Sequence, residues 1–275
     1  MTGNDRFKQG KFRLSIELYS TGIKDRIADV HELALLHLNR AASHLALSNF
    51  ASAYHDAECA LEFLASDDKG HREKALVCRA RALEGLRSLT AAAAAYQTIL
   101  DESPENADAI AGLANTQELL EQSKSGTYDW AALIKTGGSA STKVDIADFR
   151  GPSKVVERAE SGGGRGVFTT RDVKAGELLV VEKAFGVAYH VPEAAQRFVY
   201  DVQRETLRTP ADLELAGVIS AKLLDNPQLA ESIYSLNAGP NFPAPTSPAD
   251  LFGAEPAPPV RATCFIDPEI GRAHV

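Results

Sequence analysis

The chain has 275 residues, enough for two domains of ordinary size, and its 44% hydrophobic and 24% charged residues are typical of folded proteins rather than disordered ones. A formal net charge of −8, without a lysine- or arginine-rich run, argues against nucleic acid binding as the main role. No apolar segment approaches the ~20 residues of a membrane-spanning helix, so no membrane role is expected.

Residues 1–122 predict an all-α repeat array. Large residues recur at intervals of 38 and 39 positions, and residues three and seven positions later share their helical face: Phe12, Ser15 and Tyr19; Phe50, Ala53 and Ala57; Leu89, Ala92 and Tyr96. The small middle residue lets a second helix approach closely. This period, with Tyr96-Gln97-Thr98-Ile99-Leu100 and the helix-ending Ser103-Pro104-Glu105-Asn106, resembles tetratricopeptide helix pairs. A helix over about 107–121 is expected to cap the stack.

Asn4, Asn39 and Lys74 are the candidate peptide-binding residues. The resemblance implies this role, because tetratricopeptide clamps hold the acidic C-terminal tails of chaperones with Lys, Asn and Arg side chains on the concave face, and these three positions match that set. The arginine expected one turn after Lys74 is replaced by Cys78, with Arg79 one step off the face. Two interpretations stay open: a groove that binds a protein or peptide, and a repeat element that serves only the fold.

No metal site is predicted. Five histidines lie from His31 to His71, and His37 and His44 can share a helical face, but no carboxylate or thiol joins them at the short spacings of metal sites, so helix-surface histidines are expected. Three widely spaced cysteines without a Cys-x-x-Cys pair predict neither a zinc knuckle nor a disulfide framework. Scattered free thiols fit a reducing compartment, so we expect a cytoplasmic and/or nuclear protein.

Residues 123–152 are expected to form a linker. Tyr128-Asp129-Trp130 begins a short helical stretch that ends at Gly137-Gly138, and a run rich in Ser, Thr and Ala follows. Trp130 is the only tryptophan, and we expect its ring to dock the linker onto one of the two domains.

Residues 153–186 alternate like short strands around a glycine cluster. Their motifs follow in order: Arg165-Gly166-Val167-Phe168-Thr169, then Asp172-Val173-Lys174-Ala175-Gly176-Glu177-Leu178-Leu179, then Glu182-Lys183-Ala184-Phe185. This order resembles the opening strands of a SET domain, the fold of most protein-lysine methyltransferases. The resemblance implies S-adenosylmethionine as cofactor, held by Gly163, Gly164, Arg165 and Gly166. A glycine-rich hairpin without a ligand is the alternative, whereas a dinucleotide-binding loop is disfavoured because strand-like residues, not a helix, follow Gly166.

The expected fold class is α+β: an all-α tetratricopeptide solenoid followed by the first part of a β-rich SET domain over 153–269, with a helical insert over 193–236 and a proline-rich loop over 239–260. The resemblance covers nearly the whole chain and is to fungal-type proteins that carry tetratricopeptide repeats before a SET domain. Residues 270–275 are expected to be a non-native tail.

The resemblance implies a protein-lysine methyltransferase that uses S-adenosylmethionine, with the repeats recruiting a partner. SET domains use an Asn-His pair and a tyrosine near the C-terminus, but this sequence has no Asn-His dipeptide and no tyrosine after Gly239. No catalytic residue is therefore assigned, and an incomplete, inactive fragment is expected. The alternative function is a non-catalytic tetratricopeptide adaptor, similar to a co-chaperone, with a SET remnant.

Overall fold

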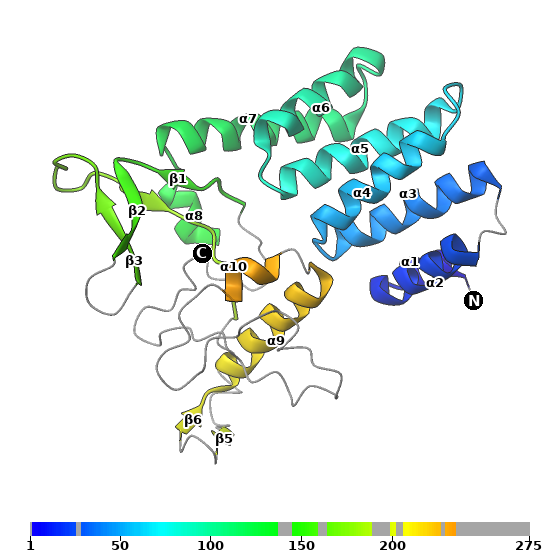
Figure 1. Ribbon diagram of the computed structural model, residues 1–275. Coiled ribbons are helices and arrows are strands. Elements are labelled where there is room, and N and C mark those ends of the chain that lie inside the picture. Colours follow the sequence, from blue (N-terminus) through cyan, green and yellow to red (C-terminus); the bar gives the residue numbers. More distant parts are fainter. Residues whose placement is uncertain are drawn as a thin grey trace. The chain divides into compact units, whose positions relative to one another are not determined.

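The computed structural model describes residues 2–25, 29–136, 145–158, 164–188, 199–201, 206–226 and 229–234 (Figure 1). The chain divides into two compact units, Met1–Ser125 and Gly126–Val275. The proline-rich loop expected at 239–260 and the tail expected at 270–275 lie outside the described residues. Within the described ranges, no helix combines the length and the apolar character needed to cross a membrane.

Helices follow one another through the described part of the first unit, and helices that are neighbours in sequence pack against each other (Figure 1). They are α1 (Gly3–Lys8), α2 (Phe12–Asp25), α3 (Val30–Ala46), α4 (Phe50–Phe63), α5 (Lys69–Gly85), α6 (Leu89–Glu102) and α7 (Ala107–Ser125). Helices α3 and α5 also contact each other, as do α5 and α7. The first members of successive helix pairs therefore lie side by side.

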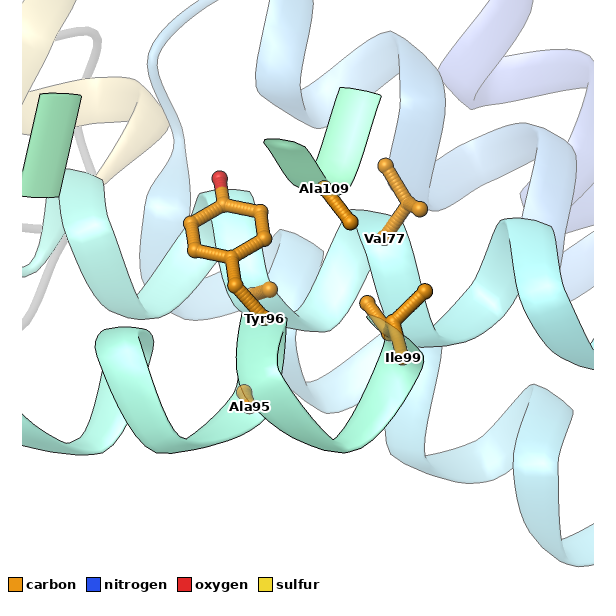
Figure 2. Packing of buried hydrophobic residues seen from close by; sticks show 6 residues of the cluster. Val77, Ala95, Tyr96, Ile99 and Ala109 are labelled. Atoms are coloured by element: carbon orange, nitrogen blue, oxygen red, sulfur yellow. The ribbon is translucent and has the colours of Figure 1, made fainter. Parts of the chain in front are cut away.

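The predicted helical face forms the core of the first unit. Ser15, Ala53 and Ala92, the small residues of the repeating pattern, are completely buried. Tyr19, Leu89 and Tyr96 are also buried, while Phe12 and Phe50 are half-buried. Figure 2 shows Tyr96 and Ile99 of α6 packed with residues of α5 and α7. Small side chains let the helix axes approach closely, and each large side chain then fills the remaining space. The expected helix pairs and their buried face are confirmed.

Helices α1, α3 and α5 end in the same kind of turn. Gly10, Ser48 and Arg87 follow these helices with φ angles of 70°, 60° and 62°, in the left-handed region. In each turn the next N–H bonds to the carbonyl five residues earlier: Lys11 to Arg6, Asn49 to His44 and Ser88 to Leu83, at 2.9, 2.8 and 3.0 Å. This is the Schellman motif, which satisfies carbonyl groups left free at a helix end. The repeat is therefore present in the turns as well as in the helices.

The second unit begins with a helix and short antiparallel strands. After α8 (Trp130–Thr136), β1 (Phe149–Arg150) pairs with β4 (Val180–Val181), and β2 (Ser153–Arg158) pairs with β3 (Gly164–Thr169) over its whole length. Strands were expected over 153–186, but each described sheet has only two of them. The described structure is therefore mostly helical with few strands, and a complete SET-like β domain is not among its parts.

Tyr128, rather than Trp130, is the buried aromatic residue of the predicted linker. Trp130 is 49% exposed, whereas Tyr128 is 7% exposed and its hydroxyl donates to the carbonyl of Ala147 at 2.8 Å. The two rings lie 5.2 Å apart between centroids. The expectation that Trp130 docks the linker is wrong, because the phenol has a backbone acceptor within reach and holds residues 128 and 147 together.

The expected helical insert over 193–236 is wrong at its first described residues. Val199–Asp201 (β5) and Thr206–Arg208 (β6) form an antiparallel hairpin, and helices begin only afterwards, as α9 (Pro210–Asp225) and α10 (Ala230–Tyr234). The β-branched and aromatic residues around 199 favour a strand, and an apolar run this short fits either period. Helix α9 starts at a capping box, in which Thr209 and Asp212 satisfy each other's backbone N–H groups.

Candidate peptide-binding positions and polar clusters

Asn4 and Asn39, two of the predicted peptide-binding residues, meet in the structure. We call Asn4, Asn39, Lys74 and Cys78 the clamp positions. The Nδ2 atom of Asn39 lies 3.4 Å from Oδ1 of Asn4, and the hydroxyl of Tyr19 donates to the same oxygen at 2.6 Å. These two donors fix the orientation of the Asn4 amide, whose own Nδ2 group makes no hydrogen bond with the described residues. Asn4 thus presents a free donor.

Glycine at position 3 makes room for this arrangement. A Cβ atom on Gly3 would lie 2.4 Å from the Tyr19 ring, so any side chain there would push the ring away from α1. Tyr19 is 4% exposed, and burial raises the pKa of its hydroxyl, which therefore remains a donor at neutral pH.

Lys74 is exposed on α5, and its ammonium group makes no hydrogen bond or ion pair within the described ranges. One turn later, burial raises the pKa of the Cys78 thiol to about 11, so this position offers no charge at neutral pH. Arg79 does not replace the missing arginine, because its Nη1 atom lies 3.2 Å from Oε1 of Glu58 on α4. The structure therefore brings Asn4 and Asn39 together and leaves Lys74 available, without a contact between Lys74 and either asparagine.

A buried aspartate joins three helices in a polar cluster that the sequence did not reveal. Asp56 of α4 is 1% exposed and accepts two hydrogen bonds from Arg40 of α3, at 2.7 and 2.6 Å. His37 Nδ1 lies 2.9 Å from the same carboxylate and His44 Nε2 lies 3.7 Å away, while Arg40 also donates to Ser20 of α2 at 2.9 Å. We call these residues the Asp56 cluster.

The Asp56 cluster corrects the expectation of surface histidines. His37 is 7% exposed, and it belongs to the interior because a carboxylate from the next helix pairs with it. Burial raises the pKa of Asp56, but hydrogen bonds from Arg40 and His37 outweigh that effect and leave the pKa below its ordinary value. Asp56 is therefore ionised at neutral pH and holds α2, α3 and α4 together.

A second cluster, His31, Asp68 and His71, has a ligand set suited to a metal ion. Nε2 of His31 lies 3.0 Å and Nδ1 of His71 lies 2.9 Å from Oδ2 of Asp68, and all three ligand atoms lie within 4.8 Å of one another. Hydrogen bonding to His71 is the main cause that lowers the pKa of Asp68. This group could not be found from the sequence, because His31 is 37 residues from Asp68. The only local signal in the sequence was the three-residue spacing from Asp68 to His71.

The predicted cofactor residues lie on strand β3, except for Gly163, which lies outside the described residues. Gly164, Arg165 and Gly166 pair with Arg158, Glu157 and Val156 of β2. A Cβ atom on Gly166 would lie 2.8 Å from the ring of Phe168, so the chain's own side chain occupies the space that a glycine would leave for a ligand. The structure thus places Gly164, Arg165 and Gly166 on a paired strand, their role in holding a cofactor stays a proposal, and no step of methyl transfer is derived.

Comparison with known proteins finds relatives of two kinds. A protein of Gibberella zeae named methyltransferase is 25% identical over 238 residues, which is 86% of this chain and 32% of that protein. RNA polymerase II-associated protein 3 of Rattus norvegicus is 31% identical over 163 residues, 59% of this chain and 23% of that protein. This chain thus spans about a third or less of the length of these relatives. No family model matches.

A solved structure with similar repeats is the second tetratricopeptide domain of human RPAP3 in complex with the HSP70 peptide SGPTIEEVD. It is 31% identical, with a TM-score of 0.36, and the alignment covers 42% of this chain and 88% of that domain. Tetratricopeptide repeat protein 4 of Homo sapiens is 40% identical over 58 residues, which is 21% of this chain and 15% of that protein. Part of this chain is thus similar in sequence to a tetratricopeptide protein, and 86% of it aligns with the Gibberella zeae methyltransferase.

Proposed function

We propose that the first unit is a protein-binding module that holds an acidic C-terminal peptide at the clamp positions. One observation carries the proposal: the Asn4 amide and the Lys74 ammonium both keep donors that no described residue uses, while Tyr19 and Asn39 hold the amide in place. Ammonium and amide donors suit carboxylates, and hydrogen bonds with an ionised partner are about twice as strong as neutral ones. The sequence similarity to tetratricopeptide proteins supports this function.

The test is fluorescence anisotropy of the full chain with a labelled SGPTIEEVD peptide, the sequence bound by the RPAP3 domain. Lys74→Ala should weaken binding by roughly tenfold or more, because a hydrogen bond to a charged group contributes about 1.5–3 kcal/mol. Lys124→Ala is the matched control, since it removes the same charge from an exposed position on α7. The proposal would be contradicted if Lys74→Ala and Lys124→Ala bound the peptide equally well. It would also be contradicted if the unaltered chain bound a C-terminally amidated peptide as tightly as the peptide with a free carboxylate.

For the second unit we propose a role as the first part of an S-adenosylmethionine-dependent protein-lysine methyltransferase. The fungal methyltransferase supports this, because its alignment covers 86% of the chain and so extends beyond the repeats. The repeats would then bring a partner to the enzyme. The order of motifs from Arg165 to Phe185 adds to this support, while Phe168 beside Gly166 argues against a ready-made cofactor cradle.

This second proposal is tested by transfer of a labelled methyl group from S-adenosylmethionine to protein lysines, with this chain and with any longer product of the same gene. Methylation that is lost in Gly164→Val, and kept in Gly217→Ala of α9, would support the role of the glycine motif. Gly217 is the control because a Cβ there meets no atom within 4 Å. If neither substitution changed the labelling of lysines, the proposed role of the glycine motif would be contradicted.

A further inference from the structure

Two histidines and an aspartate converge where α3 and α5 begin. His31 lies in the first turn of α3, Asp68 is the N-cap of α5, and His71 lies in the first turn of α5. The two imidazole rings stand edge to face, with centroids 5.7 Å apart, and both turn a nitrogen toward Oδ2 of Asp68. Three side chains from two helices thus direct their ligand atoms at one small volume.

We propose that His31, Asp68 and His71 bind a divalent transition-metal ion such as Zn²⁺. Imidazole nitrogen and carboxylate oxygen are the ligands this class of ion prefers, and sites with three protein ligands leave the other coordination positions to water. At zinc–ligand distances of about 2.0–2.2 Å, ligand atoms of a tetrahedral site lie about 3.3 Å apart. The carboxylate oxygen lies 3.0 and 2.9 Å from the two nitrogens, within a few tenths of an ångström of that separation, and all three ligand atoms lie within 4.8 Å of one another.

The surroundings suit an ion that enters from solvent. The side chains of His31, Asp68 and His71 are 53%, 22% and 37% exposed, so the ion can arrive without opening the fold. Asp68 is held in place because it also accepts the backbone N–H of His71 at 3.3 Å as the cap of α5. The bound ion would tie the start of α3 to the start of α5, the two helices that carry Asn39 and Lys74.

The experiment is a titration of the full chain with Zn²⁺ by isothermal calorimetry, repeated with Co²⁺ by absorption spectroscopy. Loss of a group that is only hydrogen-bonded to a metal ligand weakens metal binding by roughly 10–100-fold. His31→Ala and His71→Ala each remove a ligand itself, so each should weaken Zn²⁺ binding by more than that. Asp68→Asn should do the same while keeping the helix cap, since asparagine caps as well as aspartate does. Far-ultraviolet circular dichroism of each variant checks that the helices remain.

His55→Ala is the matched control, because His55 is an exposed histidine on α4 whose ring lies 3.7 Å from Cys59 Sγ, outside the proposed site. Its Zn²⁺ affinity should equal that of the unaltered chain. Affinity that Asp68→Asn leaves unchanged would overturn the proposal, as would a sulfur-to-cobalt charge-transfer band, because that band would place the ion at a cysteine. If His71→Ala fails to fold, Asp68→Asn and His31→Ala decide the question.

Discussion

The Asp56 cluster should contribute strongly to stability, and replacing one partner at a time tests this. Asp56→Asn removes the charge but keeps the size of the side chain, and it leaves the Arg40 guanidinium, 18% exposed, without its carboxylate. Breaking a buried ion pair from one side costs about 3–5 kcal/mol. Because Arg40 retains some contact with water and with Ser20, we expect a loss near the lower end, about 3 kcal/mol.

Arg40→Met should cost more, because it leaves the carboxylate, 2% exposed, with histidines as its nearest partners. We expect a loss near the upper end of the same range, about 5 kcal/mol. The double variant removes both charges, so its loss should be smaller than the sum of the single losses by about 2 kcal/mol. The coupling, more than either single value, is the signature of a desolvated pair.

Urea denaturation followed by far-ultraviolet circular dichroism measures these losses. The control is Asp108→Asn, which breaks the ion pair with Arg81, where the side chains are 51% and 59% exposed. An exposed pair contributes roughly 0–1 kcal/mol, so this variant should lose no more than that. Equal losses for Asp56→Asn and Asp108→Asn, or strict additivity in the Asp56/Arg40 double variant, would refute the argument from burial.

Three further outcomes are expected. Hydrogen bonds hold the pKa of Asp56 in the folded chain below its value in the unfolded chain, about 3.9. The stability that ionised Asp56 contributes is therefore present above pH ~3.9 and is lost as the pH falls through the folded pKa. The stability of Asp56→Asn should consequently fall less steeply in an acid titration than that of the unaltered chain. Gly112→Ala should lower the free energy of unfolding by about 1–3 kcal/mol, because the new Cβ would lie 2.3 Å from the Tyr96 ring. Gly70→Ala on α5, where a Cβ meets no atom within 4 Å, should be neutral or stabilising, and thermal unfolding of the two variants compares them. Cys78, with its pKa raised to about 11, should resist alkylation in the folded chain and react after denaturation, and rapid alkylation of the folded chain would contradict its burial.

The sequence predicted the helical repeats because the relevant signal is local. Ser15, Ala53 and Ala92 follow a fixed step from a large residue, and a step of three or four residues determines which face of a helix is buried. Strands β5 and β6 were wrongly predicted as helix, since a short apolar run satisfies both the helical and the strand period.

The polar clusters could not be predicted because their residues are far apart in the sequence. Asp56 is 19 residues from His37 and 16 from Arg40, and the distance between two residues on neighbouring helices is set by how the helices pack. Asn4 and Asn39 were found only through the resemblance to clamp sequences. Their contact through Oδ1 of Asn4, and the part that Tyr19 plays in it, became visible only with the structure.

The three left-handed turns have a consequence for protein engineering. Only the first, at Gly10, uses glycine, whereas Ser48 and Arg87 adopt the same conformation with a side chain. A left-handed residue with a Cβ atom costs about 1–2 kcal/mol, and the extra freedom of glycine in the unfolded chain costs about 0.5–1 kcal/mol, so glycine should be the more stable choice. Ser48 is the better target, because Arg87 has further interactions that glycine would remove. The natural sequence is thus not the most stable one for its own fold, and the array can be strengthened at a turn without altering any clamp position.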